Sequence, residues 1–263
     1  MHDLAFIVAG FLVGAVIGLT GVGGGSLMTP ILIFVFGVKP YLAVGTDLLF
    51  AAFTKMGGTV RLTRARLVDW RVVAHLSAGS IPAALLTLFI LHRAGPASAE
   101  IQGFMTGGLG VALLLTAAAT LYKAIRGVSA SGRHAGRDPR TVARPLLWSL
   151  PPLFGAVIGS LVTLTSVGAG AIGVTVLMLL YPLLPLPRIV AADIAYAVPL
   201  TLVAGLGHAS LGSVDWALLV KLLAGSLPGI WLGSRLMQHT PERVVRSLLS
   251  MLLAYAGFKL ITL

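Results

Sequence analysis

The chain contains an internal repeat that covers most of its length. The motif Thr-Gly-Val-Gly-Gly-Gly at residues 20–25 returns as Thr-Ser-Val-Gly-Ala-Gly at residues 165–170, an offset of 145 residues. Two further motifs return at an offset of 146 residues: residues 68–70 as 214–216, and residues 78–82 as 224–228. Two diverged halves in one hydrophobic chain are typical of secondary transporters, whose substrate site lies where the halves meet.

The composition indicates a membrane protein. Hydrophobic residues make up 57% and charged residues 10% of the 263 residues, with a mean hydropathy of +0.98, whereas a soluble domain carries about 25% charged residues. The net charge of +11 comes from basic residues between apolar segments, as the positive-inside rule requires, and not from a basic face that would bind nucleic acid. We therefore predict a single transmembrane domain over residues 1–263, located in the cell membrane.

Apolar segments predict an all-α polytopic fold with two repeats of five segments each. Repeat 1 covers residues 4–123, a linker covers 124–145, and repeat 2 covers 146–263. Segments 26–38 and 168–184 are shorter than the ~20 residues that a full span needs, and each follows a Gly-rich motif. They predict broken or re-entrant helices, whose backbone must line a cavity. The predicted segments are 4–20, 26–38, 41–60, 73–92, 101–123, 146–165, 168–184, 187–207, 216–237 and 243–262.

The distribution of arginine predicts how the repeats are oriented. Residues 61–71 contain four arginines and the linker contains five, so both are expected in the cytoplasm. Residues 208–215, which are equivalent to 62–69, contain no lysine or arginine. Equivalent loops would then lie on opposite sides of the membrane, which makes an inverted repeat and places both termini outside the cytoplasm.

The Gly-rich breaks are the predicted substrate site. Adjacent glycines let the backbone approach a ligand, and the helix that follows directs unpaired N–H groups and the positive end of its dipole at the break. Discontinuous helices of transporters bind anions in this way. The alternative is that these glycines only permit close helix packing. The predicted substrate-binding residues of the two breaks are Thr20, Gly23, Gly24, Gly25, Ser26, Thr165, Ser166, Gly168 and Gly170.

Three of the charged residues inside apolar segments are candidates for a role in transport. Asp47 and Asp193 occupy equivalent positions, and intramembrane acids by default indicate a proton or ion path; a structural hydrogen-bonding role is the alternative. Lys55 occurs in the first half alone, with Thr201 at the equivalent position. Snorkelling to the cytoplasmic face is the preferred explanation, because Arg61 follows within two turns. Contact between Lys55 and an anion in the cavity is the alternative.

The same motifs resemble the TauE/SafE sulfite exporter family, also called the toluenesulfonate uptake permease family. The resemblance covers essentially the whole chain and rests on Gly21-Val22-Gly23-Gly24-Gly25-Ser26 with Pro30 downstream, on Val44-Gly45-Thr46-Asp47, and on the Gly-rich start of the second half. It implies transport of sulfur-containing anions such as sulfite, thiosulfate, sulfoacetate or other organosulfonates. It also implies half-sites at Gly23 to Ser26 and at Gly168 and Gly170. Ala169 and Thr175 depart from the first-half pattern, which predicts a less open second break.

Together these features predict a secondary transporter that exports a sulfite- or organosulfonate-type anion, with a proton on Asp47 or Asp193 as one means of coupling. A passive anion channel is the first alternative, because dipoles can also line a pore. An intramembrane aspartyl protease with Asp47 and Asp193 as a shared-proton dyad is the second. The prediction includes no cofactor, no metal and no enzymatic activity. The expected partners are a small anion and the lipid bilayer, in an oligomeric state that the sequence leaves open.

Overall fold

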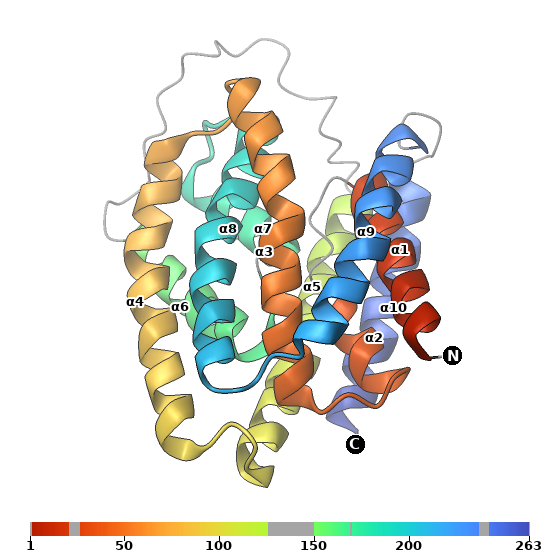
Figure 1. Cartoon of the computed structure of the whole chain (residues 1–263). Coiled ribbons are helices and arrows are strands. Elements are labelled where there is room, and N and C mark those ends of the chain that lie inside the picture. Colours follow the sequence, from red (N-terminus) through yellow and green to blue (C-terminus); the bar gives the residue numbers. More distant parts are fainter. Residues whose placement is uncertain (1, 21–26, 126–149, 169, 237–241, 263) are drawn as a thin grey trace.

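The computed structural model describes residues 2–20, 27–125, 150–168, 170–236 and 242–262, which form ten helices (Figure 1). Each predicted apolar segment overlaps one of them, which confirms the all-α class and the ten predicted segments within the described residues. The helices are α1 (His2–Thr20), α2 (Met28–Phe34), α3 (Pro40–Arg64), α4 (Trp70–Ala94), α5 (Ala99–Ile125), α6 (Leu150–Thr165), α7 (Ala171–Leu180), α8 (Leu186–Ser210), α9 (Trp216–Leu236) and α10 (Glu242–Ile261).

Helices α2 and α7 are too short to cross a bilayer. They contain 7 and 10 residues, so they are about 10 and 15 Å long at 1.5 Å per residue, against a hydrocarbon core of about 30 Å. The break before α7 has unusual backbone angles, because Gly168 and Gly170 have φ values of 137° and 140°. The prediction of interrupted helices is therefore confirmed for the second half. The first break, residues 21–26, lies outside the described residues.

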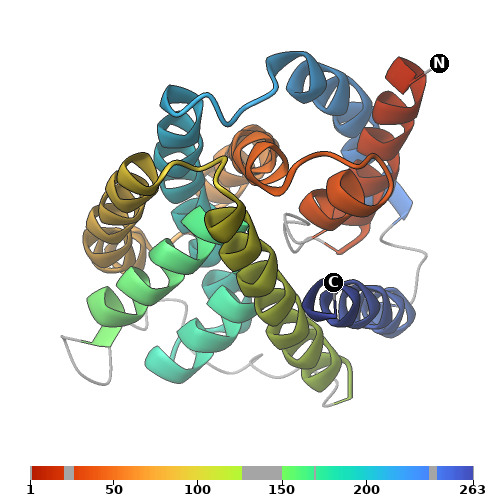
Figure 2. The ribbon, with the colours of Figure 1, turned by 90° about the horizontal axis from the view of Figure 1, so that it is seen from below.

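The helices pair in the same way when the two halves are exchanged. Helix α1 packs along α9, and α6, the equivalent of α1, packs along α4, the equivalent of α9. Helix α3 packs on its own equivalent α8, and α5 packs on its own equivalent α10. In the end-on view of Figure 2, the α3–α8 pair lies between the α4–α6 pair and the α1–α9 pair. Each half therefore contributes its fourth helix to the packing of the other half.

Glycines set the close approach of α1 to α9. On α1, a Cβ atom at Gly10, Gly14 or Gly18 would come closer than 3.0 Å to the α9 backbone. On α9, a Cβ atom at Gly225, Gly229 or Gly233 would likewise come closer than 3.0 Å to the α1 backbone. The α4–α6 pair repeats the arrangement with Gly79, Gly155 and Gly159. Small residues are the usual contact residues of membrane helices, because burial of apolar surface gives little advantage within lipid.

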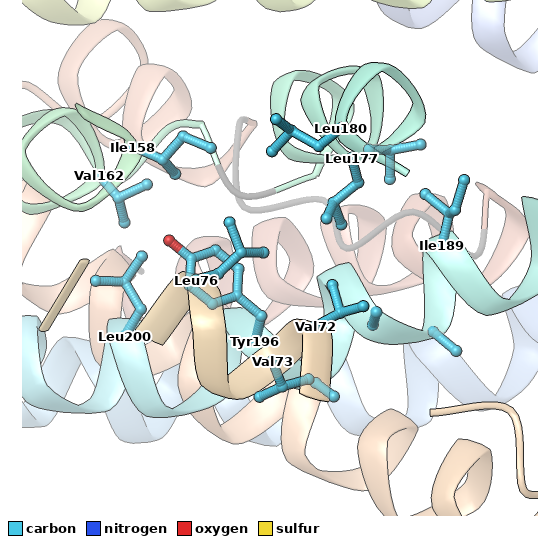
Figure 3. Packing of buried hydrophobic residues seen from close by; sticks show 14 of the residues in the cluster. Val72, Val73, Leu76, Ile158, Val162, Leu177, Leu180, Ile189, Tyr196 and Leu200 are labelled. Atoms are coloured by element: carbon cyan, nitrogen blue, oxygen red, sulfur yellow. The ribbon is translucent and has the colours of Figure 1, made fainter. Parts of the chain in front are cut away.

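The buried apolar side chains form two clusters that follow this exchange of helices. The first combines side chains of α4, and a few of α3 and α5, with those of α6, α7 and α8, as Figure 3 shows for Leu76, Val162, Leu177 and Leu200. The second combines α1, α2 and part of α3 with α5, α9 and α10. Each cluster thus contains side chains from both halves, and the halves cannot separate without exposing both clusters.

The outer surface has the apolar character that a bilayer requires. Helices α4, α5, α8 and α9 are long and apolar enough to cross a membrane, and three further described helical segments of α1, α6 and α10 are shorter and apolar. Large apolar side chains are exposed along the outside, such as Leu86, Phe89, Trp231 and Tyr255. The chain is therefore a multi-pass membrane protein, since such a surface would be unstable in water.

The loops that connect equivalent helices lie at opposite ends of the bundle. In Figure 1 the α3–α4 loop is at the top and the α8–α9 loop is at the bottom. This arrangement agrees with an inverted repeat, but the repeat boundaries, the extracytoplasmic termini and the orientation in the membrane stay predictions. The linker arginines lie outside the described residues.

We expect single cysteines at the two ends of the bundle to react from opposite sides. Ser210 and Arg64 are exposed at the ends of α8 and α3, and the chain has no cysteine of its own. On intact cells, a membrane-impermeant thiol reagent should label Ser210→Cys, and it should label Arg64→Cys only after permeabilisation, because the positive-inside rule predicts that the Arg-rich loop is cytoplasmic. Labelling of both variants on intact cells would contradict the orientation.

Candidate functional site

The contact between α3 and α8 lies at the centre of the molecule and runs antiparallel. Near one end, a Cβ atom at Gly205 would lie 2.7 Å from Leu49 Cδ2. Near the other end, a Cβ atom at Gly58 would lie 3.7 Å from Ile194 Cγ2. The residue number rises along α3 where it falls along α8, so the two helices point in opposite directions. We call this contact the α3–α8 seam.

Lys55 lies in the middle of the α3–α8 seam and is buried. It falls between the two contact points on α3, and its side chain is only 5% exposed. The preferred interpretation from the sequence, that its ammonium group snorkels to the cytoplasmic face, is therefore wrong in this structure. Snorkelling needs an outward-facing position, whereas the packing of α8 turns this face of α3 inward. Lys55 interacts electrostatically with both Asp193 and Asp47.

Asp47 joins three elements on one side of Lys55. Its carboxyl group is fully buried and accepts a hydrogen bond from the Thr29 hydroxyl of α2. The Ser166 hydroxyl, which follows α6, lies next to the same carboxyl group without a hydrogen bond of ordinary length. Asp47 of the first half thus contacts the break of the second half.

Asp193 lies against the start of α7, on the other side of Lys55. Its side chain is 2% exposed, and a Cβ atom at Gly173 would collide with its Oδ1 atom. Glycine at position 173 is therefore needed for the carboxyl group to reach the first turn of α7. A negative charge there is stabilised by the positive end of the α7 dipole. Each acid consequently contacts the first turn of one short helix, Asp47 through Thr29 and Asp193 at Gly173.

The two acids lie at different levels of the α3–α8 seam. The antiparallel register places Asp193 opposite residue 59 of α3, since Ile194 is opposite Gly58. Asp47 and Asp193 are then separated by about 18 Å along α3, at 1.5 Å of rise per residue. Two carboxyls that share a proton lie about 3 Å apart. This geometry argues against the aspartyl protease alternative.

The second break is built largely from backbone contacts. Gly168 accepts a hydrogen bond from the Gly173 amide at 3.0 Å, and Gly170 accepts one from Val174 at 2.9 Å. The Thr165 hydroxyl donates to Leu161 O at 2.7 Å and accepts from the Val167 amide at 3.2 Å. Thr165, predicted to bind substrate, is therefore engaged in closing α6. Ser166 is the other predicted hydroxyl residue of this break, and it lies next to the Asp47 carboxyl group.

The predicted substrate-binding residues of the first break fall at or beyond the end of α1. Gly23, Gly24, Gly25 and Ser26 lie outside the described residues, and Thr20 ends α1 with a side chain that is not described. Among the described residues, no group of three or more possible metal ligands occurs.

Comparison with known proteins identifies the family. The sequence pattern described as sulfite exporter TauE/SafE matches residues 6–260. The chain belongs to the TauE/SafE family. It is 35% identical to the probable membrane transporter protein YjnA of Bacillus subtilis (strain 168), over 98% of this chain and all of that protein. It is 26% identical to the probable membrane transporter protein YunE of the same organism, over 99% of this chain and 98% of that protein. No solved structure matches the chain.

We call Lys55, Asp47 and Asp193 together the charged centre of this TauE/SafE protein. Three hydroxyl residues near it were not identified from the sequence. Thr29 lies on α2 beside Asp47, and the Tyr196 hydroxyl lies near both Ser80 of α4 and Asp193 of α8. Tyr196 follows Asp193 by three residues, one helical turn, so helical periodicity could have indicated it. Ser80 belongs to the repeated Gly-Ser-x-Pro motif. The signal for Thr29 was weaker, because the equivalent residue is Val174.

Proposed function

We infer that this TauE/SafE protein is a secondary transporter that exports a sulfur-containing anion, sulfite or an organosulfonate, across the cell membrane. The observation that carries the proposal is the buried Lys55 in the α3–α8 seam, between the two halves. A lysine at this depth is costly unless an opposite charge accompanies it, and intramembrane charges mark substrate paths. The site proposed for the anion comprises Lys55, Ser166 and the break at Gly168 and Gly170, together with the first break.

The packing of the α3–α8 seam favours a carrier over a passive channel. Apolar side chains such as Leu49 and Ile194 contact the facing helix on both sides of Lys55. A permanently open pore through the seam would need polar lining at these positions. Alternating access needs only that the halves, linked by the exchanged helices α4 and α9, move relative to one another around a fixed site.

Flux into proteoliposomes tests the proposal. We expect purified protein to accumulate labelled sulfite above its external concentration when the external medium is acidic, and to give no accumulation without a gradient. Flux that only dissipates an anion gradient would indicate a channel. Absence of flux for sulfite, thiosulfate, taurine and sulfoacetate would refute the proposal. Empty liposomes are the control, because sulfite itself takes up protons and can cross a bilayer in neutral form.

A further inference from the structure

The charged centre of the α3–α8 seam holds one more acid than base. Lys55, Asp47 and Asp193 are 5%, 0% and 2% exposed, and the ammonium group interacts with both carboxyls. If all three were ionised, the centre would have a charge of −1 and would repel an anion. Buried charges are stable where they cancel. Without a bound anion, the charged centre is therefore neutral when the Lys55 ammonium group and one carboxylate are ionised and the other carboxyl group carries a proton.

Other charged or titratable groups on the helices around α3 do not change this balance. The described parts of α2 and α6 contain no titratable residue and contribute Thr29 and Ser166 at the end of α6. On α8, Tyr196 adds a phenol beside Asp193, and His208 is bound to Thr163 O at 2.9 Å. The remaining described groups lie toward helix ends or at the surface: Tyr41, Arg61 and Arg64 on α3, Arg188 at the start of α8, Glu100 and Tyr122 on α5, Lys221 (2.5 Å from Asp3) and Arg235 on α9, and Arg71, His75, His92 and Arg93 on α4, which packs on α8.

We propose that Lys55 exchanges counter-ions, a carboxylate of Asp47 or Asp193 in the empty protein and the substrate anion in the loaded protein, so that each monovalent anion binds together with one proton. The proton comes from solution and converts the displaced carboxylate to a carboxylic acid, while the ammonium group keeps its charge. Neutrality is thereby kept in both states. The inference rests on the proposed function and specifies its coupling.

The positions of the acids explain how the exchange could serve transport. Lys55 lies between Asp47, near one end of the α3–α8 seam, and Asp193, near the other. Each acid contacts the first turn of a short helix, so protonation of either one changes the charge at a break. The complex of anion and proton is electroneutral, so the membrane potential does not drive it. Export then requires accumulation of the anion in the cytoplasm, and an inward proton gradient favours uptake.

Proton uptake on binding tests the inference directly. Methanesulfonate is the first probe, because a sulfonate stays a monovalent anion at all pH values near neutrality and any proton taken up must bind to the protein. Sulfite, corrected for its own titration, is the second. Calorimetry of the detergent-solubilised full chain, in buffers with different enthalpies of ionisation, gives the number of protons bound per anion. We expect about one for wild type, on the charge balance of neutral buried centres.

Variants separate the roles of the three groups. Asp47→Asn with Asp193→Asn in one chain should bind the anion with no proton uptake and without loss of affinity at high pH. Lys55→Thr should lose at least tenfold in affinity. The internal repeat offers a matched rescue, since Thr201 is the equivalent of Lys55 and is also buried. Lys55→Thr combined with Thr201→Lys should recover binding and proton uptake, because the new ammonium group lies on the other helix of the same seam.

The outcomes distinguish the two proposals. If wild type binds neither probe and transports no sulfite, the proposed function fails, and the inference fails with it. If wild type binds a probe with no proton uptake, or if Lys55→Thr binds with wild-type affinity and proton uptake, the inference alone is overturned. A Lys55→Thr protein that does not fold is recognised by its elution on size-exclusion chromatography, and the wild-type proton count then decides.

Discussion

Gly14→Val and its equivalent Gly159→Val should each lower the amount of protein in the membrane several-fold. A Cβ atom at Gly14 would meet the backbone of Ser226 on α9, and one at Gly159 would meet the backbone of Ser80 on α4, closer than 3.0 Å in both cases. A backbone cannot move aside as a side chain can, so the paired helices must separate. Overpacking of this kind costs about 3 kcal/mol or more, and such losses reduce abundance several-fold.

Membrane abundance of a fluorescent fusion and the thermal unfolding midpoint in detergent measure this effect. Gly107→Val on α5 is the matched control, because nothing lies within 4 Å of a Cβ atom there. It should accumulate and unfold as wild type does. Normal abundance and stability of Gly14→Val would show that α1 does not pack on α9 as described.

Gly168→Val should weaken anion binding while leaving the protein in the membrane. Gly168 has a φ of 137°, a backbone conformation that is essentially restricted to glycine. Its carbonyl oxygen accepts a hydrogen bond from the Gly173 amide in the first turn of α7. Valine would also place Cβ 3.1 Å from Val162 Cγ2. The break must then shift, and with it Ser166 beside Asp47 and the turn of α7 beside Asp193. We expect a loss of at least about tenfold in affinity, or 1.4 kcal/mol.

The dissociation constant for sulfite, read from the ligand-dependent rise in the unfolding temperature, checks this prediction. Gly37→Val is the control for backbone strain alone, since Gly37 has a φ of 63° and nothing lies within 4 Å of its Cβ position. It should lower stability and keep the affinity of wild type. If Gly168→Val inserts normally and binds sulfite as wild type does, the second break is not part of the site.

The helix positions could be predicted from the sequence because they depend on local composition. The ten apolar segments overlap the ten helices of the described residues, and the Gly-rich motif at residues 165–170 coincides with the interruption between α6 and α7. Hydropathy is sufficient here, since a backbone in lipid has to satisfy its own hydrogen bonds. The residue pattern also indicated the family, which the comparison confirms over residues 6–260.

The environment of Lys55 could not be predicted in this way. On a helix that is apolar on most faces, sequence alone does not distinguish the side that faces lipid from the side that faces another helix. The contacts of Leu49 with Gly205 and of Gly58 with Ile194 fix the rotation and register of α3 against α8. That register buries Lys55 and separates Asp47 from Asp193, which argues against the dyad that their equivalent positions had allowed.

The sequence by itself therefore determined the positions of the described helices, the interruption between α6 and α7, and the presence of Asp47, Lys55 and Asp193 inside apolar segments, because each of these follows from the residues of a short segment. Only the tertiary structure decided that α4 packs on α6 of the second half and α9 on α1 of the first, that the Thr165 hydroxyl bonds to the backbone of α6, and that Lys55 lies between the two acids. These features depend on contacts between segments far apart in the chain, and close packing at glycines, which is a property of two surfaces together, selects those contacts.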